Sequence, residues 1–473
     1  MEVPANPAVG LSYPVEGETF DEVFKATGEP RPLYEPLLRG RDGAGLGALQ
    51  ATMQVQLAER GVEFGPPHSR APFGVDALPR IFPAELWADM EKGLIQRVTA
   101  LNAFLADIYG ERKVIEAGVI PARILDEAMH YEPLMEKIDS PVVAQVAGPD
   151  LVRGSDGRFS VLEDNLRSPS GLAYAAVGRQ VLEDGFADAG YSPRSFEPTY
   201  DFLAAAIRAS DPTGSGDPSM ALLTDGPISS AWFEHQELAR RLNIPLVSPG
   251  DLKVSGDNLT TVVDGVERNI NVLYNRSSTE RLTLPDDRVT PVGELLVEPM
   301  LAGNLAVANS FGTGVADDKA VHCYVDELIR FYLDEEPLLT NAKSYDLGNP
   351  RHREMVLDRL GELVVKPRWT FGGQDIVIGP RTPLERQRRL ATTIRRSPER
   401  FIAQEMVMLS THPTIVGTEI SPRHIDLRPY VMTIGDEVKV APVALTRFAR
   451  NAGELVVSSA RGGGAKDTWI LEP

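Results

Sequence analysis

The segment from residue 221 to residue 250 places the strongest constraint on the fold. Residues 221–224 are a short apolar run, residues 231–242 carry a helical pattern, and a second apolar run follows at 245–247. This order predicts a strand–helix–strand unit, in which a crossover helix joins two parallel strands. The chain is therefore expected to hold an α/β layer with a Rossmann-like βαβ subdomain.

Other segments predict further layers around this unit. Apolar residues recur every three and four positions over 46–60 and over 84–109, which predicts two helices. β-forming residues on both sides of the turn-like segment 154–157 predict a hairpin over 142–163. A basic helical pattern covers 383–400, and strand and turn patterns alternate after it. The predicted fold class is a multi-layer α/β and α+β protein.

Charge and cysteine content narrow the classes of function. The formal net charge is −19, so we expect neither nucleic acid nor an anionic membrane surface as a partner. The single cysteine, Cys323, excludes an intrachain disulfide and a thiolate metal cluster. The first residues lack the pattern of a signal peptide, and no stretch is apolar enough for a membrane span. We expect a cytoplasmic enzyme, and the sequence does not determine its oligomeric state.

Polar residues follow the apolar residues at the end of the second strand of the predicted hairpin. Strand alternation places Glu163, Asn165 and Arg167 on one face. Carboxylate and amide oxygens suit Mg²⁺, and Asp150, across the hairpin, offers a third oxygen ligand. A purely structural strand end rich in Asp and Asn is the alternative.

A lysine followed by a glycine turn forms a second candidate site. An apolar strand ends at Lys366, and Gly372, Gly373 and Gln374 precede another apolar run. Backbone N–H groups of such a turn can close over nucleotide phosphates beside a lysine. A tight hairpin with a solvated lysine is the alternative.

Two further patterns place polar groups near apolar strands. Gln404 and Glu405 stand in an apolar run, where such a pair either contacts an adenine or ribose or caps a sheet. Arg428 and Arg447 precede a triple glycine at 462–464. This arginine and glycine pattern indicates either an anion or substrate site or a structural turn.

Taken in order, these segments resemble the ATP-grasp superfamily in its circularly permuted form. The chain is similar to the bacterial group called circularly permuted ATP-grasp type 2, whose members are often labelled as glutathionylspermidine synthases. The candidate metal ligands precede the candidate nucleotide lysines, which is the reverse of the unpermuted order. The resemblance runs from about residue 70 to the C-terminus. The matching segments are 79–81, 96–102, 163–171, 314–319, 366–367, 426–429 and 462–469.

The resemblance implies ATP and Mg²⁺ as cofactors. Its implied magnesium ligands are Asp150, Glu163 and Asn165. Its implied nucleotide contacts, with the glycines as a mobile lid, are Lys319, Lys366, Gly372, Gly373, Gln374, Gln404 and Glu405.

The resemblance also implies catalytic roles for Arg167 and Lys366. Substrate contacts are expected from Ser168, Ser170, Arg428 and Arg447. Arg167 stands where glutathionylspermidine synthetases have an aspartate, as it does in the chain's own group, and segments 442–447 and 459–464 depart from the group's pattern. These differences leave the acceptor substrate open.

The expected function is an ATP-dependent carboxylate–amine ligase that works through an acyl phosphate. The expected substrates are a small-molecule or peptide carboxylate and an amine, with a polyamine as one candidate. The alternatives are an ATP-binding regulatory or assembly protein without turnover and an ATP-dependent phosphotransferase. The predicted domains are an irregular and helical segment (1–75), a permuted ATP-grasp half with the metal-binding strand (76–215), the Rossmann-like subdomain (216–300) and the nucleotide-binding part (301–473).

Overall fold

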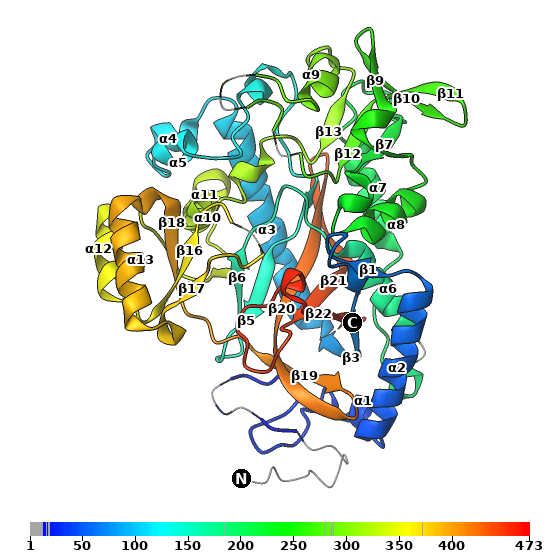
Figure 1. The fold of residues 1–473 in the computed structure, drawn as a ribbon, viewed down its shortest axis with the longest axis vertical. Coiled ribbons are helices and arrows are strands. Elements are labelled where there is room, and N and C mark those ends of the chain that lie inside the picture. Colours follow the sequence, from blue (N-terminus) through cyan, green and yellow to red (C-terminus); the bar gives the residue numbers. More distant parts are fainter. Residues whose placement is uncertain are drawn as a thin grey trace.

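A central, mostly antiparallel sheet uses strands from both halves of the chain (Figure 1). The structure is a computed structural model that describes residues 13–473 except 16, 18, 184, 280, 285, 287 and 371. The strand order is β14–β6–β5–β20–β21–β22–β3, and β4 and β19 also pair with β20. The strands are β3 (Val75–Phe82), β4 (Val146–Ala147), β5 (Asp150–Arg153), β6 (Phe159–Glu163), β14 (Thr340–Asn341), β19 (Thr411–Val416), β20 (Glu419–Ile434), β21 (Glu437–Phe448) and β22 (Gly464–Ile470).

Helices cover both faces of this sheet because the long strands are apolar on both sides. Leu427 and Val431 of β20 pack in one core with α3 (Ala84–Ile108). Tyr430 and Met432 lie in a separate core with the helices of the opposite face. These helices are α2 (Gly43–Glu59), α6 (Leu172–Leu182) and α7 (Pro198–Arg208). The predicted helices over 46–60 and 84–109 are confirmed by α2 and α3.

The predicted hairpin is confirmed, although it is shorter than the pattern suggested. β5 and β6 are antiparallel, and Asp150 is the cross-strand partner of Glu163. The preceding residues contribute only the two-residue strand β4, because Gly148 and Pro149 interrupt the extended run.

A second, four-stranded sheet is parallel. Its order is β13–β12–β7–β8, and its predicted unit is confirmed as β7, α8 and β8. A meander of β9, β10 and β11 extends from it at one end of the molecule (Figure 1). The elements are β7 (Met220–Leu223), α8 (Trp232–Leu242), β8 (Leu246–Val247), β9 (Leu252–Ser255), β10 (Asn258–Val263), β11 (Val266–Ile270), β12 (Val272–Asn275), α9 (Gly293–Leu301) and β13 (Ala306–Ala308).

A small antiparallel sheet has a core of its own. Its order is β15–β18–β16–β17, and α12 and α13 pack against it through residues such as Val356 and Ile394. The helix α13 confirms the predicted basic helix. The elements are β15 (Ser344–Asp346), α12 (Pro350–Asp358), β16 (Leu363–Pro367), β17 (Val377–Ile378), α13 (Leu384–Arg396) and β18 (Phe401–Glu405).

Short elements connect these layers. Two of them are the helices α10 (Lys319–His322) and α11 (Val325–Leu333), which residues 323 and 324 separate. No helix in the part of the chain that the structure describes is long and apolar enough to cross a membrane. The connecting elements are α1 (Glu35–Leu38), β1 (Glu63–Phe64), β2 (Ala71–Pro72), α4 (Lys113–Glu116), α5 (Arg123–Asp126), α10 (Lys319–His322) and α11 (Val325–Leu333).

Candidate active site

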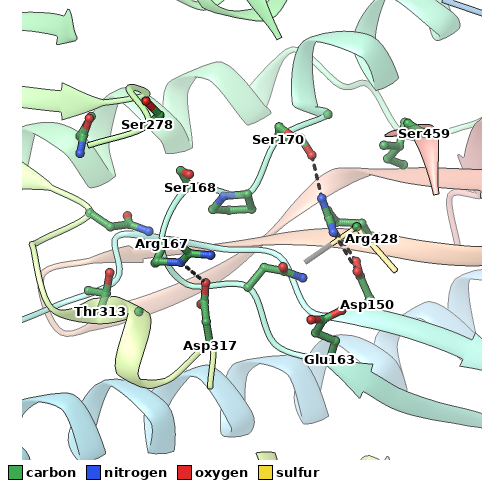
Figure 2. A pocket seen from close by; sticks show the side chains of 18 of the residues that line it. Asp150, Glu163, Arg167, Ser168, Ser170, Ser278, Thr313, Asp317, Arg428 and Ser459 are labelled. Carbon is green, nitrogen blue, oxygen red and sulfur yellow. Dashed lines mark hydrogen bonds and ion pairs between the residues drawn. The ribbon is translucent and has the colours of Figure 1, made fainter. Parts of the chain in front are cut away.

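A cavity of about 350 Å³ lies where the central sheet, the parallel sheet and the glycine turn meet (Figure 2). Its walls come from the ends of β5 and β6, from the loop 167–171 and from the loops after β12 and β13. Gly372 and Gly373 close another side. A smaller cavity of about 30 Å³ adjoins it and shares Glu163, Asn165 and Arg167 in its lining.

Asp150 holds two arginines at the floor of the main cavity. Its Oδ1 accepts from Arg428 Nε at 2.7 Å, and its Oδ2 accepts from Arg428 Nη2 at 2.8 Å. Arg447 Nη2 lies 2.9 Å from the same Oδ2 and also contacts Asp426 at 2.6 Å. Burial raises the pKa of Asp150, but the charges of Arg428 and Arg447 outweigh it and lower the pKa below its ordinary value.

Glu163 and Asn165 lie beside a lysine. Glu163 Oε1 is 2.8 Å from Lys319 Nζ, and this ammonium also donates to the carbonyl oxygen of Thr370. Asn165 Nδ2 donates to Gly148 O at 3.0 Å. Lys319 lines the smaller cavity, and Glu163 lines both cavities, so the ion pair lies beside the wall that the two cavities share.

Lys366 is delivered by β16 to a buried polar pair. Its Nζ donates to Gln404 Oε1 at 2.6 Å, and Gln404 Nε2 donates to Ser344 Oγ at 3.0 Å. Burial lowers the pKa of Lys366 to about 8; the charge of Glu163 opposes this shift and that of Lys319 adds to it. The described linings of the two cavities do not include Lys366 and Gln404, which lie on the small antiparallel sheet.

The two residues of the pair Gln404 and Glu405 point in opposite directions, as neighbours on a strand do. Glu405 accepts from Arg359 Nη1 at 2.9 Å and from Tyr345 Oη at 2.6 Å. The structure therefore brings Gln404, and not the side chain of Glu405, to Lys366.

The glycine turn contacts the C-terminal loop. Arg461 Nη2 donates to Gly373 O at 2.5 Å, and Thr370 Oγ1 donates to Gln374 O at 3.2 Å. Gly373 has a φ of 77°, and a Cβ there would lie 2.7 Å from Val456 Cγ1. Glycine is required at this position because the turn passes so close to the loop. The side chain of Gln374 is exposed to solvent.

Arg167 is held by Asp317, a residue to which sequence reasoning gave no role. Asp317 Oδ2 accepts from Arg167 Nε at 2.8 Å, and its Oδ1 accepts from Leu166 N. Burial raises the pKa of Asp317 in spite of the charge of Arg167. The only signal for it in the sequence was its place two residues before Lys319 in the matching segment 314–319.

Hydroxyl groups form much of the remaining wall. Ser168 and Ser170 lie on the loop 167–171, and Ser170 O accepts from Arg428 Nη1 at 3.3 Å (Figure 2). The loops after the parallel strands add hydroxyl groups that sequence reasoning missed. These residues are Ser277, Ser278, Thr279, Ser310 and Thr313. The carboxyl ends of β12 and β13 point to this cavity, which is the usual position of ligand sites in parallel sheets.

The side-chain oxygen atoms at the cavities show whether a divalent cation would fit there. Glu163 and Asn165 line both cavities and offer the hard oxygen ligands that Mg²⁺ prefers. Asp150 already accepts from two guanidinium groups. Among the described residues, no group of three or more His, Cys, Asp or Glu side chains is arranged to hold a metal. Glu163 and Asn165 fit a site of the magnesium type, in which the protein supplies few ligands and phosphates supply others.

Known proteins match this chain over nearly its whole length. A Frankia alni protein provisionally named glutamate–cysteine ligase 2-3 is 41% identical over 95% of this chain and 54% of its own length. An uncharacterized protein of Synechocystis sp. is 38% identical over 96% of this chain and 98% of its own length. The chain thus spans about half the length of the Frankia relative and nearly all of the Synechocystis relative.

A solved structure shares the fold of this chain, and a family model identifies its family. The apo structure of a glutathione synthetase-like effector from Globodera pallida matches with a TM-score of 0.59 at 11% identity. The match covers 91% of this chain and 98% of that chain, and it shows a likeness of fold. The family model described as circularly permuted ATP-grasp type 2 matches residues 79–449. The resemblance of the ordered motifs is thereby confirmed, and this chain belongs to the circularly permuted ATP-grasp type 2 family.

Proposed function

We propose that the chain is an ATP-dependent carboxylate–amine ligase that works through an acyl phosphate. The observation that carries this proposal is the wall shared by the two cavities. Glu163, Asn165 and Arg167 face the small cavity with Lys319 on one side and the hydroxyl-rich main cavity on the other. A nucleotide held on the lysine side would present its terminal phosphate to a carboxylate held in the main cavity.

The residues divide the chemistry between them. Lys319 now contacts Glu163, and Lys366 contacts Gln404. Each lysine would exchange this partner for a nucleotide phosphate and neutralise its charge. Glu163 and Asn165 would hold a divalent cation, which supplies positive charge beside the β- and γ-phosphates when it is bound. Arg167 would stabilise the negative charge of the transferring phosphoryl group. Ser168 and Ser170 would orient the acceptor, and Gly372 and Gly373 would limit water at the acyl phosphate.

The names of related proteins support an amide-forming reaction. The Frankia relative carries a name for joining glutamate to cysteine, and this chain matches about half of that protein. The ATP-grasp family supports ATP and a divalent metal as cofactors. We take a small-molecule or peptide carboxylate and an amine as substrates, in a cytoplasmic setting that suits a chain with one cysteine.

An assay of ADP release tests the proposal. The purified chain would receive Mg²⁺ and ATP with L-glutamate and L-cysteine, with glutathione and spermidine, and with each compound alone. We expect ADP and phosphate release only when both compounds of a pair are present, together with an amide product that joins them. A stable phosphorylated product without phosphate release would instead favour a phosphotransferase. Nucleotide binding without ADP release for either pair would favour a binding protein.

A further inference from the structure

The loop that carries Ser168 and Ser170 is held by a buried ion pair from the parallel-sheet layer. Glu234 lies on α8, and Arg276 follows β12. Their side chains are 1% and 3% exposed, and Arg276 Nη2 donates to Glu234 Oε1 at 2.8 Å. The described lining of the main cavity includes neither residue. The pair therefore lies behind the loop and not in the cavity.

The contacts of this pair are directed at the backbone of the loop. Glu234 Oε2 accepts from Gly171 N at 2.7 Å and from Ala173 N at 3.1 Å. Arg276 Nη1 donates to Pro169 O at 2.8 Å. The ion pair thus binds the loop on both sides of Ser170.

The start of α6 explains why a carboxylate stands there. Gly171 is the N-cap of α6 and has no side chain to accept from the first N–H groups of the helix. Glu234 supplies this acceptor from another layer, and its negative charge is favourable at a helix N-terminus.

The backbone of the loop has little room for another conformation at Gly171. Gly171 has a φ of 116°, and a Cβ there would lie 2.6 Å from both Leu445 Cδ2 and Tyr430 Oη. Tyr430 Oη also donates to Ser170 O at 3.1 Å. Because the backbone is bound at Pro169, Ser170 and Gly171, the directions of the Ser168 and Ser170 side chains depend on these buried groups.

We propose that Glu234 and Arg276 are positioning residues of the ligase. They set the backbone of the Ser168–Ser170 loop and so orient the acceptor, although they do not touch it. This inference rests on the proposed function for the role of the loop, while the control of the loop by the pair is independent of the reaction.

The test compares two buried glutamates. Glu234→Gln keeps the size of the side chain but removes the charge that serves Arg276 and the two N–H groups. Glu22→Gln is the matched control, because Glu22 accepts from Arg80 Nε at 2.8 Å and Nη2 at 2.6 Å and is 3% exposed. A merely structural role would make both variants lose stability and behave alike in every other measurement.

The first readout is amide hydrogen exchange in the protein without substrates. We expect the N–H groups of Gly171 and Ala173 to exchange at least tenfold faster in Glu234→Gln and at the wild-type rate in Glu22→Gln. Unchanged exchange of these two groups in Glu234→Gln would overturn the inference. If Glu234→Gln does not fold, Arg276→Lys takes its place, since one ammonium cannot reproduce both guanidinium bonds, and the same two N–H groups are measured.

The second readout is steady-state turnover with the faster of the two substrate pairs given above. We expect the KM for the carboxylate to rise at least tenfold in Glu234→Gln, with the KM for ATP within twofold of wild type. Equal increases in both constants would overturn the inference. If wild type turns over neither pair, the proposed ligase function fails, and the exchange measurement alone decides whether the pair sets the loop.

Discussion

The cations on the two sides of the active site are held in different ways. On the side proposed to hold the nucleotide, Lys366 contacts Gln404 at 2.6 Å and Lys319 contacts Glu163 at 2.8 Å. On the opposite side, Arg428 makes two bonds to Asp150, and Arg447 makes two bonds to Asp426 at 2.9 and 2.6 Å. Each lysine has one side-chain partner, an amide for Lys366 and a carboxylate for Lys319. Each arginine instead binds a buried carboxylate through two nitrogens.

The difference separates charges that can move from charges that hold the framework. A lysine is a point charge on a flexible stem and can exchange one acceptor for a phosphate. A planar guanidinium bound through two nitrogens loses both bonds together when it moves. We therefore expect substitutions on the lysine side to reduce turnover and substitutions on the arginine side to reduce stability.

The largest effect tests the arginine side. Asp150→Asn leaves Arg428 and Arg447 with too little negative charge in a buried site, so we expect a loss of about 3–5 kcal/mol in the free energy of unfolding. Urea unfolding followed by circular dichroism measures it. Asp188→Asn is the control, since Asp188 is 74% exposed in its pair with Arg41 and should cost about 1 kcal/mol or less. A stable Asp150→Asn protein that lacks only turnover would favour the predicted metal role of Asp150 over a framework role.

The next effect tests the lysine side. Lys366→Ala and Glu163→Ala should each lower ATP-dependent turnover by about 100- to 1,000-fold, because each removes a charge or ligand from the phosphate site. The ADP-release assay measures the rates, and urea unfolding checks that the fold is kept. Turnover within tenfold of wild type in either variant would contradict the site assignment.

A smaller effect comes from pH. The pKa of Lys366 is about 8, so the ammonium loses its proton as the pH rises through 8. Because a phosphate binds the charged form, the affinity for ATP should fall above pH 8, by at most about tenfold per pH unit. Titration calorimetry between pH 7 and pH 9.5 measures it. Lys366→Arg keeps its charge over this range and should show a flat profile, and a flat wild-type profile would contradict the role of Lys366.

The smallest effect tests the predicted adenine contact of Glu405. The side chain of Glu405 faces Arg359 and Tyr345, so Glu405→Gln should change the KM for ATP by about twofold or less. Gln404→Ala removes the partner of Lys366 and should change this constant more. A larger effect at Glu405 than at Gln404 would reverse the assignment of the two residues.

Local patterns predicted the elements that carry the site. The turn at 154–157 and the alternation of β-forming residues were enough to place Asp150 across from Glu163, and the register confirms this. The parallel unit of β7, α8 and β8 followed from apolar runs of the right length. The opposite directions of Gln404 and Glu405 also follow from strand alternation, although they were treated as one contact. The domain boundaries at 75, 215 and 300 stay predictions.

Contacts between distant segments could not be predicted in the same way. Asp317 reaches Arg167 from 150 positions away, and Arg428 reaches Asp150 from 278 positions away. In the sequence, Glu234 is one charged residue within the helical pattern of 231–242, and an exposed helix face explains such a residue equally well. Its burial depends on the packing of α8 against α6, which no local pattern records.

The sequence alone determined the family, the parallel unit, the hairpin and the order of the motifs, because periodicity and short motifs are local properties of the chain. The tertiary structure alone decided which polar and charged groups meet: Lys366 with Gln404, Asp150 with two arginines, and Glu234 with the backbone of the loop 167–171. The physical reason is burial. A charged group that leaves water needs a partner, and the partner is whichever polar group the fold brings within hydrogen-bond distance.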